Sequence, residues 1–199
     1  MRLPPLYYIR HGETDWNKQG LIQGWIDTDL NEQGRAQARD LAQALISRQS
    51  ELNHFDFFVS PQRRAQDTMR TIADAQFRDF STVTTDARLR ELGFGIWEGR
   101  PFWELKASPI YPADPEGRYS FRPEGGESYE DGVARVTSFL SELKSPALIV
   151  AHGAVGRCLM GYVTGLPGEA IVDLATPQGC YCKLENGTAS WFDASHSRL

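Results

Sequence analysis

The stretch Leu6-Tyr7-Tyr8-Ile9-Arg10-His11-Gly12 decides the fold, because an apolar run typical of a buried strand ends in Arg-His-Gly. A second stretch far along the chain, Leu148-Ile149-Val150-Ala151-His152-Gly153, repeats the pattern. In open α/β sheets, ligands bind beyond the carboxyl ends of parallel strands, so we expect both imidazoles in one crevice. Glycine after each histidine lets the chain turn sharply and lets backbone N–H groups approach a ligand closely. The repeated pattern therefore indicates a two-histidine site for an anion.

Strands and helices alternate around these two stretches. Helical periodicity follows a plausible cap at Asn31, and it follows Ser128, which forms a capping-box pattern with Asp131. Strand composition marks six segments: 6–9, 55–59, 82–84, 147–151, 180–184 and 189–192. We therefore predict a three-layer α/β fold, with a mostly parallel sheet and helices on both of its faces. The turn Glu185-Asn186-Gly187 predicts a hairpin that adds an antiparallel edge near the C-terminus.

The length and one unusual segment suggest the domain organisation. A chain of 199 residues fits a single domain over 1–199. Segment 100–126 breaks the strand-helix rhythm with prolines and aromatic residues, and we expect a lid-like excursion over the crevice. The alternative is a surface insertion packed by its own aromatic side chains.

Composition limits the possible partners. The net charge of −5 argues against a nucleic-acid-binding surface, which requires clustered Lys and Arg. No apolar run approaches the roughly 20 residues that span a bilayer, and the first residues resemble no signal peptide, so we expect no membrane partner and a cytoplasmic location. Cys158, Cys180 and Cys182 lack the paired spacing of zinc sites, so we interpret them as reduced, buried thiols.

Phosphoryl transfer needs a nucleophile, cations around the phosphoryl oxygens and a proton for the leaving oxygen. Arg10 and His11 offer the first two. A third strand ends at Ser60, and Pro61 suits the first position of a following helix that carries Arg64 in its first turn. Arg63 would serve equally on these grounds, since adjacent helical residues differ only in the face they occupy.

Four motifs in this order resemble those of the histidine phosphatase superfamily, also called the phosphoglycerate mutase-like family. They are RHGETDWN at 10–17, SPQRRAQDT at 60–68, ELGFGIWEG at 91–99 and AHG at 151–153. The resemblance covers most of the chain and implies that family's fold. Asp67 departs from the glutamine common in the second motif.

Carried over residue by residue, the resemblance implies that His11 is the nucleophile and becomes phosphohistidine. Arg10, Arg64 and His152 would bind the phosphoryl oxygens, which decides for Arg64 over Arg63. Glu91 would be the proton donor, although it could also be a solvated carboxylate. Asn17 would contact phosphate through its side chain and Gly153 through its backbone N–H.

The physical chemistry of these groups is consistent with the implied roles. His11 can attack only when one ring nitrogen is unprotonated, and the cationic Arg10 and Arg64 lower its pKa below about 6.5. Glu91 must instead hold a proton until the leaving oxygen takes it. The arginines supply the charge that a metal would otherwise supply, so we expect no metal and no cofactor.

Within the family, water or a second substrate could receive the phosphoryl group. Cofactor-dependent mutases resemble one another in a Glu-Arg-His-Tyr-Gly motif, whereas this chain has Glu91-Leu92-Gly93-Phe94-Gly95, which is similar to the phosphatase branch. We therefore expect a phosphomonoesterase acting on a small phosphorylated metabolite. The alternatives are a mutase, a phosphatase of protein phosphohistidine and a catalytically idle binding module.

Recognition of the rest of the substrate is left open by the sequence. Trp25, Trp103 and Tyr111 are candidates, whereas Arg118 and Arg122 fit solvated loop charges better. His54 and His196 lie outside every motif. The oligomeric state is not predicted.

Overall fold

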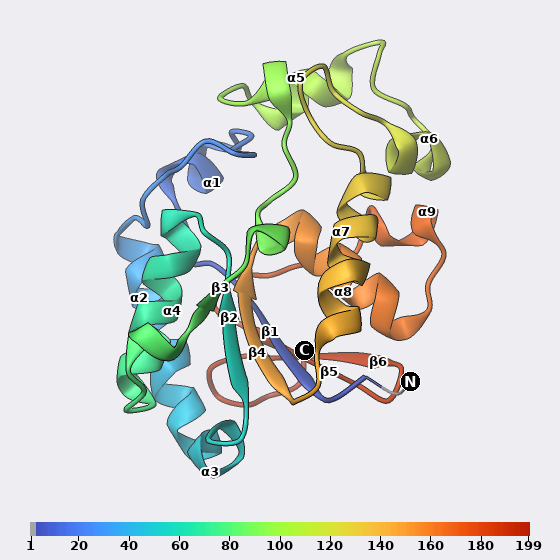
Figure 1. The fold of residues 1–199 in the computed structure, drawn as a ribbon. Helices are drawn as coiled ribbons and strands as arrows, with labels where there is room; N and C mark the ends of the chain where they lie inside the picture. The colour runs from blue at the N-terminus through green and yellow to red at the C-terminus, as the bar shows by residue number, and fades with distance from the viewer. Residues whose placement is uncertain (1–2) are drawn as a thin grey trace.

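The computed structural model describes residues 3–199. Its helices and strands alternate along most of the chain, as the sequence predicts (Figure 1). The strands are β1 (Leu6–Arg10), β2 (Asp56–Val59), β3 (Thr84–Thr85), β4 (Ala147–Ala151), β5 (Tyr181–Glu185) and β6 (Thr188–Phe192). The α-helices are α1 (Asp15–Gln19), α2 (Glu32–Leu45), α3 (Gln49–Leu52), α4 (Arg63–Ala75), α5 (Phe102–Ala107), α6 (Pro115–Ser120), α7 (Tyr129–Glu142), α8 (Gly153–Thr164) and α9 (Gly168–Ile171).

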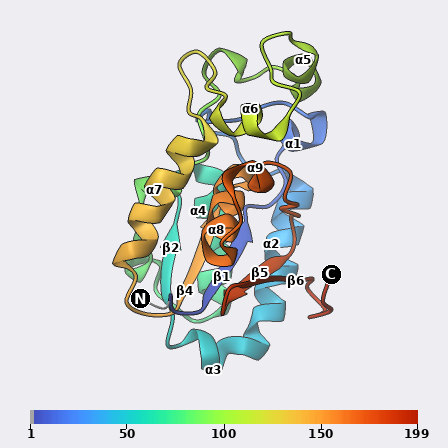
Figure 2. The same ribbon diagram turned by 90° about the vertical axis from the view of Figure 1, so that its right-hand side faces the viewer.

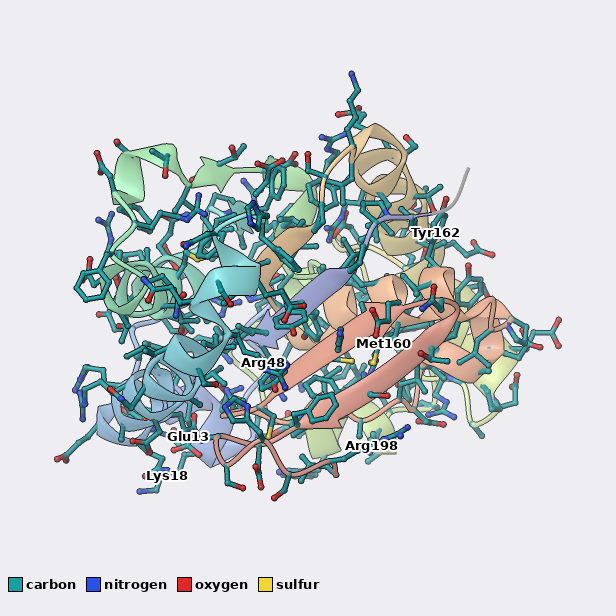
Figure 3. All side chains as sticks on the ribbon, turned by 90° about the horizontal axis from the view of Figure 1, so that it is seen from below. Glu13, Lys18, Arg48, Met160, Tyr162 and Arg198 are labelled. Carbon is teal, nitrogen blue, oxygen red and sulfur yellow. The ribbon has the colours of Figure 1, made fainter. Side chains whose placement is uncertain are left out.

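The strands form one six-stranded sheet in the order β3-β2-β4-β1-β5-β6. β1, β2, β3 and β4 run parallel, and the hairpin of β5 and β6 adds the predicted antiparallel edge. Figure 3, seen from below, shows this hairpin at the end of the molecule opposite α5 and α6. The register pairs Arg10 with Ala151, so β1 and β4 end side by side. This register brings the two His-Gly pairs together.

Helices cover both faces of the sheet, which confirms the predicted three layers. Figure 1 shows α2 and α4 on one side and α7 and α8 on the other. Side chains of a strand alternate between the two faces. Leu6 and Tyr8 accordingly belong to the core beneath α7 and α8, whereas Tyr7 and Ile9 belong to the core beneath α2 and α4.

Local signals for helix ends are confirmed at two helices. Asn31 caps α2 by accepting a hydrogen bond from the N–H of Gly34, and Ser128 and Asp131 form a capping box at α7. The prediction for Pro61 was wrong, because Gln62 is the N-cap and α4 begins at Arg63. The strand expected at 82–84 was also displaced: Phe80–Thr82 form a 3₁₀ turn, and β3 contains only Thr84–Thr85.

Segment 100–126 contains α5 and α6 and lies above the carboxyl ends of the strands (Figure 2). Leu105 packs with Ile22 and Trp97 in a small third core. Tyr111 packs edge-on against both Phe102 and Phe121, so the segment has its own aromatic packing. That it acts as a lid stays a prediction.

Two expectations from composition can be compared with the structure. Cys158, Cys180 and Cys182 are free and buried, as predicted. Within residues 3–199, every helix is too short or too polar to cross a membrane.

Candidate active site

Three neighbouring parallel strands each deliver a polar residue to the same edge of the sheet. His11 follows β1, His152 follows β4 and Ser60 follows β2. The ring centroids of His11 and His152 are 5.1 Å apart, and both side chains are almost fully buried. The two His-Gly pairs therefore bring both imidazoles together at this edge of the sheet, as predicted.

The His11 ring is fixed by its own backbone. Its Nδ1 lies 2.7 Å from the carbonyl oxygen of Gly12, which can only accept a hydrogen bond, so Nδ1 carries the proton. Burial, followed by the charges of Arg64 and Arg10, holds the pKa of His11 well below 6.5. The ring is therefore neutral, and Nε2 has a free lone pair. Burial contributes more than the arginines, on which the sequence argument relied.

Gly12 has a different use from the one expected. Its N–H donates to the hydroxyl of Thr68 rather than facing a ligand. A Cβ at residue 12 would lie 2.3 Å from the carbonyl oxygen of Gly34 in α2, so the loop after β1 can pack against that helix only without a side chain. Glycine is required here for close backbone approach.

Ser60 is a site residue that the sequence analysis did not single out. Its Oγ lies 2.7 Å from Nε2 of His152, and both residues are fully buried. Burial and nearby Arg64 hold the pKa of His152 well below 6.5. Nδ1 of His152 has no hydrogen-bond partner among the described residues. The available signal was positional, since Ser60 follows a strand as His11 and His152 do.

The two arginines reach the histidines from different elements. Arg10 ends β1 and donates to the carbonyl of Thr176, whereas Arg64, which is fully buried in α4, donates to the carbonyls of Gly24 and Ile26. Burial lowers the pKa of Arg64 to about 10, which leaves it cationic at neutral pH. In both residues the buried Nε is without a partner in the described part of the chain. Arg63 instead forms exposed ion pairs with Asp27 and Asp29.

Glu91 lies at the N-terminus of α8. Its carboxylate accepts hydrogen bonds from the N–H groups of Ala154 and Val155 at 3.2 to 3.4 Å, and His152, the N-cap residue, provides no side-chain cap of its own. The Glu91 carboxylate therefore occupies the capping position that the N-cap residue of α8 leaves open.

Gln62, which the sequence analysis did not single out either, connects Glu91 to the arginine site. Its amide oxygen accepts from the N–H of Glu91, and its amide nitrogen donates to the carbonyl of Gly24, which also accepts from Arg64. Trp25 donates from Nε1 to the Glu91 carbonyl. The backbone of Glu91 is therefore held on both sides.

The two further phosphate contacts implied by the resemblance lie at the same site. Oδ1 of Asn17 accepts from Gln178 and from Thr14, which directs the NH₂ group of the amide away from these partners. Asn17 lines a cavity of about 250 Å³ with Arg10, His11, Arg64 and Glu91, which we call the histidine cavity. Gly153 is the first residue of α8 and lies beside Arg10.

A second cavity of about 250 Å³ adjoins the histidine cavity and shares Arg10, Glu91, Phe94 and Phe102 with it. We call it the distal cavity. Segment 100–126 lines one side of it, with Lys106, Tyr111, Arg118 and Phe121 among the lining residues.

The candidates for substrate recognition are distributed unequally around the distal cavity. Tyr111 lines it, whereas Trp103 is 68% exposed outside it and Trp25 supports the Glu91 loop. Arg118 differs from the solvated loop charge that we expected, because its side chain lines the cavity and pairs with Asp173. Arg122 is exposed and pairs with Asp131.

Within residues 3–199, no group of three or more His, Cys, Asp or Glu side chains lies close enough together to hold a metal ion. The charged residues that line the histidine cavity together with His11 are Arg10, Arg64 and Glu91.

The fold and the pair of buried histidines define a class of enzymes that act on phosphoryl groups. The chain belongs to the histidine phosphatase superfamily (branch 1), whose family model matches residues 6–193.

Individual relatives differ in the activities for which they are named. The chain is 35% identical to a glucosyl-3-phosphoglycerate phosphatase of Mycolicibacterium vanbaalenii over 84% of its own length and 77% of the relative's. It is 33% identical to a 2,3-bisphosphoglycerate-dependent phosphoglycerate mutase of Mesorhizobium japonicum, over 87% of this chain and 88% of that protein. The solved structure of an α-ribazole phosphatase from Shigella flexneri superposes with a TM-score of 0.78 at 28% identity, covering 93% of both chains. Relatives named for phosphatase activity and one named for mutase activity therefore each match most of this chain.

Proposed function

We propose that this protein is a phosphomonoesterase that hydrolyses a small phosphorylated metabolite through a phosphohistidine at His11. One observation carries the proposal: the neutral His11 shares its site with three buried donors that have no partner among the described residues, namely Nε of Arg10, Nε of Arg64 and Nδ1 of His152. Buried donors left without an acceptor are costly, and a phosphoryl group supplies acceptor oxygens.

In the first half of the reaction, Nε2 of His11 attacks phosphorus as the bond to the ester oxygen breaks. Glu91 gives its proton to that oxygen, and the alcohol leaves. Arg10, Arg64 and His152 hold the phosphoryl oxygens, with Asn17 and the N–H of Gly153 as further donors. Charge on the transferred group is stabilised by these fixed donors.

In the second half, Glu91 takes a proton from water as that water attacks phosphorus, and the N–P bond to His11 breaks. Inorganic phosphate leaves, and the neutral imidazole and the protonated carboxyl are restored. Removal of the acid-base group costs about 10²- to 10⁴-fold in rate.

The experiment measures phosphate release in a chelator from p-nitrophenyl phosphate, 3-phosphoglycerate and α-ribazole phosphate. We expect release by the wild type and its loss in His11→Ala. His54→Ala removes an exposed histidine outside the site and should act as the wild type. We expect Glu91→Gln to retain one covalently bound phosphoryl group that acid removes, and His11→Ala to retain none. This result would identify the intermediate as phosphohistidine at His11.

Absence of release, or equal release from wild type and His11→Ala, would contradict the proposal. The mutase is the second candidate, favoured by the mutase-named relative, and predicts isomerisation of 3-phosphoglycerate primed by 2,3-bisphosphoglycerate. Hydrolysis that is faster than this isomerisation supports the phosphatase.

The cytoplasmic location of the protein stays a prediction.

A further inference from the structure

The wall of the distal cavity contains a part-buried arginine, Arg157, that forms no ion pair with a carboxylate of the described chain. Arg157 lies on α8 and lines the cavity. Its Nε donates to the carbonyl of Leu174 and its Nη1 to the hydroxyl of Tyr129, and neither partner is charged. Nη2 donates to none of the described residues within hydrogen-bond distance.

The other charged groups of this cavity are already paired or exposed. Arg118 makes two hydrogen bonds of 2.7 Å to Asp173, and Glu127 is paired with Arg135. Lys106 extends over the ring of Phe102. Arg10 lies where the two cavities join and is assigned to the phosphoryl group, so Arg157 is the part-buried cation that remains for a ligand on this wall.

Tyr129 adds a second donor at the same place. Its oxygen accepts from Arg157 at 2.6 Å, and within the described residues its own O–H finds no acceptor. Burial raises the pKa of Tyr129 to about 12 against the opposing charge of Arg157, so the phenol keeps its proton. Tyr129 also lines the distal cavity.

The position of Arg157 relates the donor pair to the reacting centre. Arg157 follows Gly153 by four residues on α8, so the two share a face of the helix and lie about 6 Å apart along its axis. Side chains of a helix lean toward its N-terminus, which directs the guanidinium toward Glu91 and Arg10. Because Arg10 and Glu91 line both cavities, one small substrate can contact the reacting centre and Arg157 together.

We propose that Arg157 and Tyr129 bind a carboxylate of the leaving alcohol, so that the preferred substrates are small phosphomonoesters with a carboxylate a few bonds from the ester oxygen. Two converging donors and one unneutralised positive charge match a carboxylate with its two oxygens and single negative charge. A second phosphate dianion would carry one negative charge more than Arg157 can neutralise. This inference rests on the proposed function and adds the substrate class.

The test uses pairs of esters that differ only at this group: O-phosphoserine against O-phosphoethanolamine, and 3-phosphoglycerate against glycerol 3-phosphate. We expect the wild type to favour the carboxylate member of each pair by about tenfold or more in kcat/KM, as for a hydrogen bond to a charged group. Arg157→Met should remove the preference and leave hydrolysis of O-phosphoethanolamine and p-nitrophenyl phosphate within about threefold of wild type.

Two further variants guard against a folding defect. Tyr129→Phe removes a single hydroxyl and should reduce the preference in part, whereas Arg122→Met removes an exposed arginine of the excursion and should keep it. Equal rates within each wild-type pair would overturn the inference, and so would an equal loss on all esters in Arg157→Met and Tyr129→Phe. Faster hydrolysis of bisphosphates than of carboxylates would also overturn it.

Calorimetric binding of the same pairs to His11→Ala separates the inference from the proposed function. Tighter binding of the carboxylate members without turnover by the wild type would support the subsite and refute the phosphatase. Turnover of p-nitrophenyl phosphate without any carboxylate preference in binding would refute the subsite alone.

Discussion

At the scale of single residues, catalysis depends on which ring nitrogen of each histidine carries the proton. The Gly12 carbonyl fixes His11 with its proton on Nδ1. Ser60 is buried, and among the described residues Nε2 of His152 is the one group near its hydroxyl that can accept its proton. Ser60 therefore donates, Nδ1 of His152 carries the proton, and this unpartnered N–H is available to a phosphoryl oxygen.

Ser60→Ala should lower kcat/KM by about tenfold to a hundredfold, because one buried nitrogen loses its partner and the ring is no longer held in one tautomer. Ser81→Ala removes an exposed hydroxyl and serves as control. Long-range ¹⁵N NMR should show His152 protonated at Nδ1 in the wild type and a mixture of tautomers in Ser60→Ala. Unchanged NMR signals together with unchanged kinetics would contradict the assignment.

The positions of His11, His152 and Arg64 in the fold were predictable because each follows a recognisable strand or lies in the first turn of a helix, whereas their roles stay a prediction. The partners of those residues were not predictable. The bond between Ser60 and His152 and the bonds of Gln62 depend on strand register and on loops far apart in sequence. Strand register is set in the folded sheet. A sequence motif therefore does not show which side chains the register brings into contact.

At the scale of elements, helix ends with a side-chain cap were predicted well. The start of α4 and the position of β3 were predicted poorly. A cap is a local hydrogen bond between a side chain and a nearby N–H, as at Asn31. The start of α4 depends instead on tertiary contacts, since the N–H of Arg63 donates to Asp27 in a distant loop. The two-residue β3 is defined by its pairing with β2.

The close packing of α2 against the loop after His11 predicts that a glycine-to-alanine substitution in this helix destabilises the protein instead of stabilising it. Alanine in place of glycine inside a helix normally stabilises a protein by about 1 kcal/mol. At Gly34, however, a Cβ would lie 2.0 Å from the carbonyl oxygen of Glu13, so we expect Gly34→Ala to destabilise the protein by about 1 to 3 kcal/mol. Urea unfolding measures the difference, with exposed Gln33→Ala as control. A stabilised Gly34→Ala would show that the contact is not tight.

At the scale of the whole molecule, the predicted three layers and the antiparallel edge are confirmed. The prediction succeeded because β4 is apolar throughout and β1 is buried up to Arg10, a pattern typical of parallel strands covered on both faces. The path of segment 100–126 could not be predicted in this way, because its aromatic residues do not recur at helical or strand spacing.

Burying two neutral histidines also makes stability depend on pH. Their pKa values are lowered in the folded protein, so the unfolded chain binds more protons as the pH falls below about 6.5. The stability that they contribute is complete above that pH and is lost toward acid, at about 1.4 kcal/mol per pH unit for each histidine. The double variant His11→Gln, His152→Gln should lose less stability than the wild type between pH 7 and 5 in urea unfolding. Phosphate must be absent, because a bound ligand would itself stabilise the wild type. Parallel pH curves would contradict this account.

The distal cavity is built partly from segment 100–126, whereas His11, His152, Arg10 and Arg64 belong to the sheet and its helices or directly follow them. Mutation and selection can therefore act on the two parts separately. Under the proposed function, insertions or exchanges in the excursion should change the alcohol that is accepted and leave the proposed phosphoryl-binding residues in place. A gene library randomised only at the excursion positions that line the distal cavity should yield descendants with new substrates and an inherited chemistry.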